Sequence, residues 1–329
     1  FATGMAAISS TMFALLRSGD HIVSSAFLFG NTNSFFATLQ RLGIEVSFVD
    51  ATDASSIEAA IRPNTKLVFS ETIANPATQI ADLQGIGKIC ESKGLIFCVD
   101  NTMTSPHLFN PKSIGASLVV NSLTKYIGGH GNALGGVVTE TGNYDWTVFD
   151  NIYDTYRKGD PSLWGITQIK KKGLRDIGAS LGPEAAHHLA VGSETLPMRM
   201  DRACKNAQVL AEFCETQAKV NKVYYPGLSS HPQHDRAGSL FKGYGAIFSI
   251  DLAEGVDCFD CLNKMEDIVS SSNLGDNRTL AIPVAHTIYF EMGAQRRASM
   301  GIADSMIRFS VGIEEIDDLI NDLKRAFSE

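Results

Sequence analysis

Short runs of β-branched and other apolar residues alternate with amphipathic stretches through the first half of the chain. The runs lie at 21–25, 44–49, 66–70, 95–99, 118–122 and 135–139. The stretch 82–93 is a typical spacer between two of them. Its Leu83, Ile86 and Ile89 fall on one helical face. Strands that alternate with helices in this way predict βαβ units and a mainly parallel sheet with helices on both faces.

The pattern changes after the last of these runs. The segment 144–172 is aromatic and polar without a period, which predicts an excursion or a lid-like insertion. A long helical stretch follows, from about 183 to 218. A smaller α/β region comes next, with predicted strands at 246–251 and 306–311, and it ends in an amphipathic helix over 314–327.

These changes predict an α/β fold of two domains. Residues 1–197 would form the large domain, which holds the mainly parallel sheet, and residues 198–329 a smaller C-terminal α/β domain. A chain of 329 residues is long enough for two domains, and it needs neither a disulfide nor a metal to stabilise its core.

Composition narrows the class of protein. Lys and Arg number 28 against 36 Asp and Glu, and the net charge of −8 argues against a nucleic-acid partner. The apolar runs are interrupted too often to form a membrane-spanning helix. The sequence also lacks the H-E-x-x-H motif that would predict a zinc site. The six cysteines, including the Cys258-x-x-Cys261 pair, lie in apolar runs or at helical spacings. They are therefore interpreted as reduced core thiols of a cytoplasmic protein.

Polar residues follow three of the predicted strands. Asn75 comes after the third run and Asp100 after the fourth, while Ser122, Thr124 and Lys125 lie at the end of the fifth. Because the carboxyl ends of parallel strands meet at one edge of a sheet, we expect that edge to collect an amide, a carboxylate, two hydroxyls and a lysine.

This set of groups is typical of a site for pyridoxal phosphate (PLP). The cofactor needs a lysine amine for a Schiff base and a carboxylate against its pyridine nitrogen. Its phosphate needs backbone N–H groups at a helix N-terminus, which residues 3–7 would supply, and Phe29 would provide an aromatic plane over the ring. If each residue is considered alone, Lys125 is more simply interpreted as a solvated loop lysine and Asp100 as a helix-capping aspartate. The G-x-S-x-G sequence at 178–182 follows no predicted strand, which argues against a hydrolase.

Several longer segments carry a resemblance to a known family. They are ATGMAAI (2–8), ETIANPATQIADL (71–83), CVDNTMTSP (98–106), NSLTKYIGGHG (121–131), ETLPMRM (194–200), VYYPGLSSHP (223–232) and IRFSVGIEEIDDLINDL (307–323). On these segments the chain resembles the cystathionine γ-synthase family of PLP-dependent enzymes, which have the fold-type I, aminotransferase-like fold. Three further segments, 142–146, 174–183 and 272–283, are most similar to O-acetylhomoserine sulfhydrylases.

The resemblance implies a role for each matching residue. Lys125 would form the Schiff base and Asp100 would pair with the pyridine nitrogen. Asn75 would lie beside the phenolic oxygen of the cofactor. The phosphate-binding residues would be Gly4, Met5, Ser122 and Thr124. Arg308 would bind the α-carboxylate of the substrate, for which its planar fork is suited, near Asn273, where many relatives have Ser.

The activity implied is γ-replacement, in which sulfide or a small thiol displaces the acid from O-acetylhomoserine or another O-acylhomoserine and yields homocysteine or methionine. Cystathionine γ-synthase and a β- or γ-lyase such as methionine γ-lyase are alternatives within the family. An aminotransferase is a more distant one. A non-catalytic binding protein is disfavoured, because Lys125 and Asp100 are both present. The family also implies a homo-oligomer, a tetramer of two active dimers.

The chain departs from the family pattern at a few positions. Phe29 stands where Tyr is common, so no phenol can assist proton transfer there, and GHGN replaces the usual GHSD. The chain begins at Phe1 without an initiator Met, and its first residues already belong to the expected phosphate-binding segment. We therefore expect a natural segment upstream. The family's Tyr and Arg that reach a neighbouring subunit's phosphate would lie in it.

Overall fold

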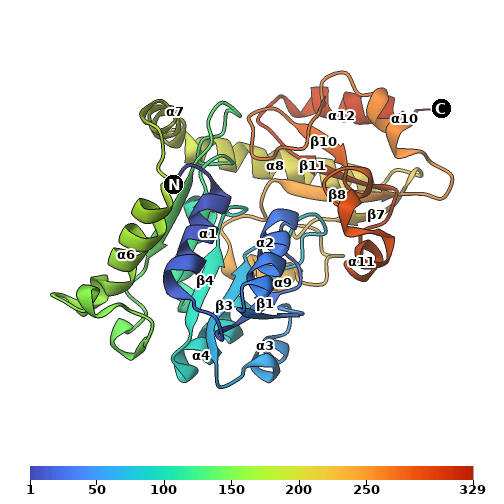
Figure 1. Ribbon diagram of the computed structural model, residues 1–329. Coiled ribbons are helices and arrows are strands. Elements are labelled where there is room, and N and C mark those ends of the chain that lie inside the picture. The colour runs from blue at the N-terminus through green and yellow to red at the C-terminus, as the bar shows by residue number, and fades with distance from the viewer. Residues whose placement is uncertain (329) are drawn as a thin grey trace.

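A six-stranded sheet forms the first part of the molecule in the computed structural model, which describes residues 1–328 (Figure 1). Its strand order is β2-β1-β3-β4-β5-β6. The strands are β1 (His21–Ser25), β2 (Glu45–Val49), β3 (Thr65–Glu71), β4 (Ile96–Asp100), β5 (Leu118–Ser122) and β6 (Gly136–Glu140). Neighbouring strands are parallel except β6, which runs antiparallel to β5. The predicted α/β class and mainly parallel sheet are therefore confirmed.

Helices cover both faces of this sheet because its strands are apolar on both sides. On β3, Val68 packs in one core cluster with Ile86, while Leu67 and Phe69 pack in another with Met12. The helices and the 3-10 turn of this region are α1 (Gly4–Leu15), α2 (Gly30–Arg41), α3 (Ala54–Ala60), α4 (Leu83–Lys93), α5 (Ser105–Leu108) and η1 (Pro111–Ile114). Two buried layers thus hold the strand ends rigidly in place.

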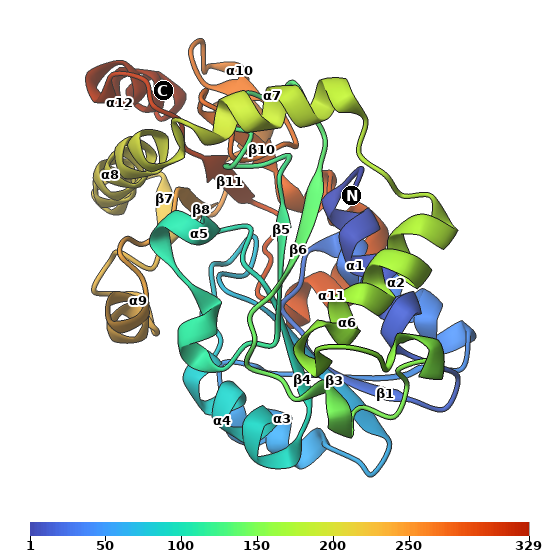
Figure 2. The same cartoon turned by 90° about the vertical axis from the view of Figure 1, so that its left-hand side faces the viewer.

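The segment 144–172 is not a lid. It forms short turns and helices, namely η2 (Trp146–Val148), η3 (Asp154–Tyr156), η4 (Pro161–Leu163), α6 (Trp164–Gln168) and the start of the π-helical turn η5 (Ile169–Arg175). Trp146, Phe149 and Ile169 are buried in the same core cluster as α1, and α6 lies beside α1 (Figure 2). The aromatic residues that obscure the period serve this packing, so the segment is the excursion of the two predicted alternatives and not the lid-like insertion.

The long helix predicted over 183–218 is two helices, α7 (Pro183–Ser193) and α8 (Leu196–Glu215). Pro197 lies in the first turn of α8, where its missing N–H costs no hydrogen bond. A helix continuous through this position would lose that bond, so the chain turns between the two helices. The α8 helix then packs on α5 and on strands of the second sheet.

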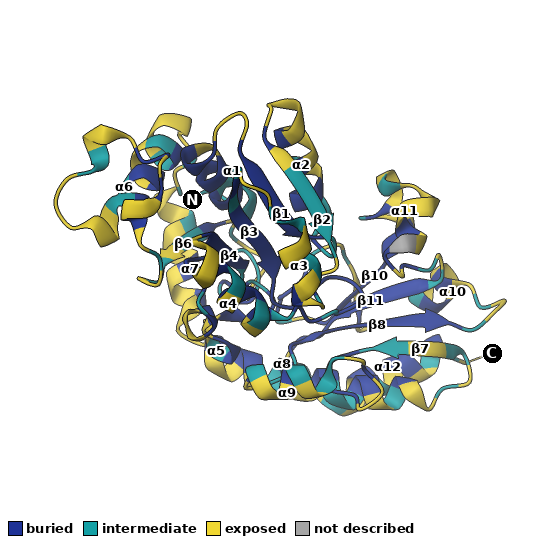
Figure 3. Cartoon of the chain, turned by 90° about the horizontal axis from the view of Figure 1, so that it is seen from below, coloured by how far each residue is buried: buried dark blue, intermediate teal, exposed yellow. Residues whose placement is uncertain are grey.

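A second, five-stranded sheet occupies the C-terminal part, with strand order β7-β8-β11-β10-β9. Its strands are β7 (Val220–Tyr224), β8 (Ile247–Leu252), β9 (Val269–Ser270), β10 (Leu280–Pro283) and β11 (Met306–Ser310). Its helices and turns are α9 (His234–Leu240), α10 (Cys258–Asn263), η6 (Val284–His286), η7 (Phe290–Met292), α11 (Ala294–Ser299) and α12 (Ile316–Ala326). Figure 3 shows β8, β10 and β11 buried, with more exposed helices outside them. Strands β8 and β11 were predicted, whereas β7, β9 and β10 were not.

All six cysteines are free thiols, and five of them are buried. Cys258 and Cys261 both lie in α10 and are buried within the core of the second sheet, as the amphipathic pattern predicted. Burial raises the pKa of the Cys90 thiol to about 12, so that thiol stays protonated at neutral pH. No helix in residues 1–328 combines the length and apolar character that crossing a bilayer requires.

Candidate active site

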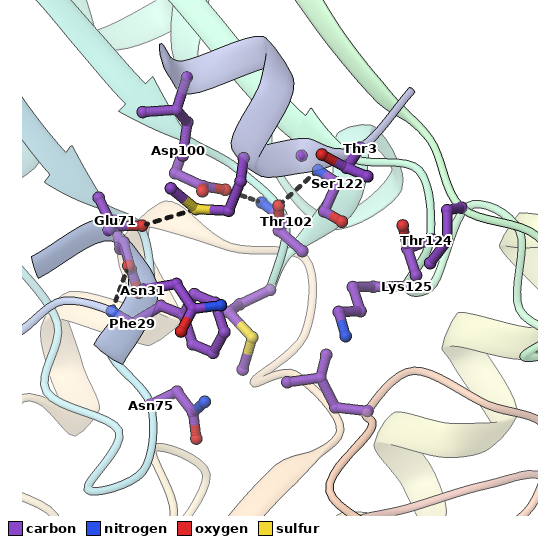
Figure 4. Close-up of a pocket in the computed structure, with 17 residues that line it drawn as sticks. Thr3, Phe29, Asn31, Glu71, Asn75, Asp100, Thr102, Ser122, Thr124 and Lys125 are labelled. Carbon is purple, nitrogen blue, oxygen red and sulfur yellow. Dashed lines mark hydrogen bonds between the residues drawn. The ribbon is translucent and has the colours of Figure 1, made fainter. Parts of the chain in front are cut away.

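A cavity of about 350 Å³ lies where the carboxyl ends of β3, β4 and β5 meet the N-termini of α1 and α2. Most of the candidate site residues line it, namely Gly4, Met5, Phe29, Asn75, Asp100, Ser122, Thr124 and Lys125. Figure 4 shows Lys125 across the cavity from Glu71. The remaining two, Asn273 and Arg308, come from the second part of the chain and contact this set from outside the wall.

The N-terminus of α1 forms one end of the cavity. The Thr3 hydroxyl caps the helix by accepting the Ala6 N–H at 2.9 Å, while the N–H groups of Gly4 and Met5 precede the first intrahelical bond. A Cβ on Gly4 would lie 2.8 Å from the Cβ of Ser122, so only glycine lets α1 begin against the end of β5. Unpaired N–H groups beside a serine hydroxyl at a helix N-terminus suit an anion such as phosphate.

Two neighbouring carboxylates form the opposite end. Glu71 and Asp100 are register partners on β3 and β4. Glu71 Oε1 accepts the Phe29 N–H at 2.7 Å, and Asp100 Oδ1 accepts the Thr102 N–H at 2.9 Å. Burial raises the pKa of both groups, and the Asp100 charge raises that of Glu71 further. Within residues 1–328 neither group takes part in a salt bridge, and a cationic ligand group at this end would favour their ionised forms.

Glu71 is a residue that the sequence reasoning left without a role. Its position in the sequence could have identified it, because Glu71 directly follows the apolar run 66–70, as Asp100 follows the run 95–99. What the strand pattern could not show is that parallel register sets the two carboxylates side by side. The α2 helix then closes over them, since its N-terminal Phe29 both bonds Glu71 and lines the cavity.

Lys125 lies in the turn after β5, with its amine held inside the protein. The Nζ atom donates to Asn273 Oδ1 at 2.6 Å. Gly275 makes this contact possible, because its φ is +75° and a Cβ there would lie 2.6 Å from the Tyr126 nitrogen. Burial, together with the Arg308 charge, lowers the pKa of Lys125 to about 8. A neutral amine, which can act as nucleophile or base, is therefore accessible near neutral pH.

This lowered pKa predicts a pH dependence of stability in the cofactor-free protein. Between about pH 8 and pH 10.5 the unfolded chain binds the Lys125 proton and the folded chain does not. The contribution of this group to the free energy of unfolding therefore rises with pH across that window. Urea unfolding of the wild type and of Lys125→Met isolates the effect, because every other group is shared. A stability difference that does not move in favour of the wild type from pH 8 to 10.5 would refute it.

Arg308 lies on β11, almost fully buried, one layer behind the cavity wall. Its guanidinium donates to the carbonyls of Ser272 and Asn273, at 3.1 and 2.8 Å, and more weakly to Asn75 Oδ1 at 3.4 Å. Its Nε has no partner within the described residues. Burial lowers the pKa of Arg308 to about 10. Arg308 thus meets the cavity through Asn75 and carries a positive charge that no side-chain carboxylate in residues 1–328 neutralises.

Arg308 does not pair with the carboxylates that follow it in the sequence. Glu314 instead accepts from the Thr279 hydroxyl at 2.9 Å, and Glu315 pairs with Arg202 at 3.0 Å. Arg308 therefore does not serve to form a structural ion pair with Glu314 or Glu315.

Arg199 is a second residue that sequence reasoning missed. It is buried on α8, and its guanidinium donates to the carbonyls of Tyr126, Ile127 and Gly192 at 2.6, 3.1 and 2.7 Å. Two of these carbonyls directly follow Lys125, so Arg199 fixes the turn that carries the lysine. The helical pattern alone could not show this contact, which joins residues more than seventy positions apart.

We expect Arg199→Leu to destabilise the protein by about 3 kcal/mol, because it leaves buried carbonyls without donors. Thermal melts with and without added PLP measure the loss. Arg202→Leu on the same helix is a suitable control. It removes a partly exposed ion pair with Glu315 and a bond to the Glu314 carbonyl, to which Asn206 still donates, so a loss below about 1 kcal/mol is expected. Equal melting temperatures for Arg199→Leu and the wild type would contradict this role of Arg199 in the turn.

The residues of the cavity fit PLP. The paired carboxylates would face the pyridine nitrogen, and the N–H groups of Gly4 and Met5 with Ser122 would hold the phosphate. Phe29 would cover the ring, and the Lys125 amine would carry the cofactor. Thr124 lines the wall beside Lys125, although its hydroxyl is already bonded to the backbone of Gly135. The Lys125 amine is also bonded, to Asn273 Oδ1, and would give up this bond to carry the cofactor.

Comparison with known proteins supports PLP as the cofactor. The family model for Cys/Met metabolism PLP-dependent enzymes matches residues 1–328. An L-methionine gamma-lyase of Fusobacterium nucleatum is 36% identical over 99% of this chain and 78% of its own length. A homocysteine synthase of Schizosaccharomyces pombe is 36% identical over 98% of this chain and 79% of its own length.

Among solved structures, cystathionine gamma-lyase from Lactobacillus plantarum, complexed with L-serine, superposes with a TM-score of 0.90. It is 32% identical over 99% of this chain and 80% of its own. This similarity confirms the fold-type I architecture expected from the sequence. Family, fold and cavity thus agree that pyridoxal 5'-phosphate is the cofactor, and the chain belongs to the PLP-dependent enzymes of cysteine and methionine metabolism.

Proposed function

We propose that the protein catalyses γ-replacement on an O-acylhomoserine, with O-acetylhomoserine as the preferred substrate. Sulfide or a small thiol would take the place of the acyl group, giving homocysteine or methionine and the free acid. The observation that supports this most is that Lys125 lines both the cofactor cavity and a second cavity of about 380 Å³. The second space can admit a second reactant at the reacting carbons.

The residues of the chain would share the work as follows. PLP, when bound, supplies the electron sink that stabilises negative charge on the substrate. Asp100, next to Glu71, would keep the ring nitrogen protonated. Lys125, displaced by the substrate amine, would take the proton from Cα as a neutral base and then move a proton from Cβ, so that the γ-substituent can leave. After the thiol has added at Cγ, it would return a proton to Cβ and to Cα. Asn273 would hold the displaced amine, because its Oδ1 already accepts from Nζ.

A γ-lyase is the second candidate, because the compared proteins include an L-methionine gamma-lyase and a cystathionine gamma-lyase. The two activities share every step up to loss of the γ-substituent. They differ in the next step. A thiol adds to the unsaturated four-carbon fragment in γ-replacement, whereas water hydrolyses that fragment to 2-oxobutyrate and ammonia in a γ-lyase. Product analysis separates them.

The test is incubation of the holoenzyme with O-acetylhomoserine, with and without sulfide. Homocysteine and acetate in equal amounts, dependent on sulfide, are expected for γ-replacement. If 2-oxobutyrate and ammonia form at the same rate with or without sulfide, the enzyme is a lyase and the proposal is wrong. O-succinylhomoserine in parallel reactions examines the acyl group, and pyruvate as amino acceptor examines the aminotransferase alternative.

Arg308→Lys is expected to weaken substrate use more than cofactor binding. Lysine keeps the charge but loses the fork that can bind two carboxylate oxygens, and a charged hydrogen bond contributes roughly 1.5–3 kcal/mol. The value of kcat/KM should therefore fall by about 10- to 100-fold. Cofactor absorbance and melting temperature serve as controls. A variant with normal kinetics per folded molecule and a lowered melting temperature would give Arg308 a structural role only.

A further inference from the structure

The loop that follows β3 carries Asn75 and is held by hydroxyl groups from the second part of the chain. Asn75 lines the cofactor cavity (Figure 4), while its backbone carbonyl accepts the hydroxyl of Tyr289 at 2.5 Å. The next carbonyl, that of Pro76, accepts the Ser249 hydroxyl at 2.8 Å. These donors lie 214 and 173 positions further along the chain. The backbone that presents Asn75 to the cavity is therefore fixed from outside its own sheet.

Tyr289 is a rigid donor for this purpose. It lies between η6 and η7 and is buried in one core cluster with Val284 and Met306. Its own N–H donates to the Val284 carbonyl at 3.0 Å. Burial raises the pKa of the Tyr289 hydroxyl, and the nearby Glu71 charge raises it further. The hydroxyl therefore stays protonated at neutral pH, and its position is set by the packing around the ring.

The side chain of Asn75 depends on this backbone for its direction. Arg308 Nη1 lies 3.4 Å from Asn75 Oδ1, which is a long and weak hydrogen bond. With its oxygen toward the guanidinium, the amide presents its N–H groups as donors to the cavity. A negatively charged phenolic oxygen on the cofactor is a strong acceptor for such donors. Since Arg308 holds the amide only weakly, the carbonyl bond from Tyr289 is the firmer constraint on Asn75.

We propose that Tyr289 is a positioning residue for the cofactor. By holding the Asn75 carbonyl, its hydroxyl directs the Asn75 amide toward the phenolic oxygen of PLP. Tyr289 is absent from the described lining of the cavity, so its influence on the cofactor passes through Asn75. The inference applies equally to a γ-replacing enzyme and to a γ-lyase, because both would bind the same cofactor in this cavity.

Binding of two cofactors that differ only at the phenolic oxygen tests this role. The probes are PLP and 3-deoxypyridoxal 5'-phosphate, which lacks that oxygen. Equilibrium dialysis of the full chain gives a dissociation constant for each. Loss of a hydrogen bond to a charged oxygen corresponds to about 10-fold, so Tyr289→Phe should bind PLP about 10-fold more weakly than the wild type. Its affinity for the 3-deoxy cofactor should change by less than about 2-fold.

Asn75→Ala shows whether the effect passes through the amide. This variant should already favour PLP over the 3-deoxy cofactor by about 10-fold less than the wild type does. Adding Tyr289→Phe to it should change the ratio of the two dissociation constants by less than about 2-fold, because the amide that Tyr289 would direct is gone. A further fall of about 10-fold in the double variant would show that Tyr289 acts by another route and would overturn the inference.

Tyr225→Phe is the matched control. Tyr225 is also buried, and its hydroxyl donates to the Gly245 carbonyl at 3.0 Å rather than to the Asn75 loop. Its loss should lower the melting temperature and leave the ratio of the two dissociation constants unchanged. If Tyr289→Phe weakens both cofactors equally or neither of them, or if Tyr225→Phe discriminates against PLP to the same extent, Tyr289 does not position Asn75.

Discussion

Lys125→Ala is expected to abolish turnover while leaving the fold intact. The variant loses the amine that would carry PLP and would remove and return the protons at Cα and Cβ, and positioned acid–base groups contribute about 10²- to 10⁴-fold each. A fall in kcat/KM of at least about 10³-fold is therefore expected, measured as acetate release from O-acetylhomoserine. The alanine should not disturb packing, because the Lys125 side chain extends into the cavity rather than into a core cluster.

A matched control is Lys112→Ala, which removes an exposed lysine in the turn η1, outside the cavity lining. This variant should retain wild-type activity and PLP content. Lys125→Ala should bind PLP reversibly, so that dialysis removes it. If the Lys125→Ala protein keeps PLP through denaturation and turns over at half the normal rate, Lys125 is not the residue that carries the cofactor.

Asp100→Asn is expected to have the second largest effect. The amide is nearly isosteric, and its Oδ1 can still accept the Thr102 N–H, so the fold should survive. It cannot stabilise a positive pyridine nitrogen, and removing one partner of a buried ion pair costs about 3–5 kcal/mol. Activity should therefore fall by about 10²- to 4 × 10³-fold. Stopped-flow absorbance and kcat/KM measure the loss, with melting temperature as the check on folding.

Glu71→Gln gives the comparison that identifies which carboxylate acts. Glu71 is already held by the Phe29 N–H, and its pKa is raised by burial and by Asp100. If Asp100 is the group that faces the ring nitrogen, Glu71→Gln should cost less activity than Asp100→Asn. A larger loss in Glu71→Gln would exchange the roles of the two residues.

The first sheet and most of the cavity follow from local patterns in the sequence. Each strand is a short apolar run, and polar residues at the strand ends meet because parallel strands share one edge. For this reason the strand pattern alone predicts that Asn75, Asp100 and Lys125 lie near one another. The N-terminus of α1 is also visible in the sequence, since Thr3 and Gly4 form a capped helix start.

The features that could not be predicted from the sequence depend on contacts between distant segments. Strand β10 is only four residues long and β9 only two, which leaves no periodic pattern to detect. The bonds from Lys125 to Asn273 and from Arg199 to Tyr126 join residues far apart in the chain. The layer in which Arg308 lies, behind Asn75, likewise depends on how the second sheet packs against the first.

The most direct test of the proposed site is to find which lysine carries PLP. Borohydride reduction of the holoenzyme fixes the cofactor to its amine, and digestion followed by mass spectrometry locates the modified residue. We expect one pyridoxyl group per chain, on the peptide that contains Lys125, and none on the Lys112 peptide. A pyridoxyl group on any other lysine, with Lys125 unmodified, would contradict the site described for this protein.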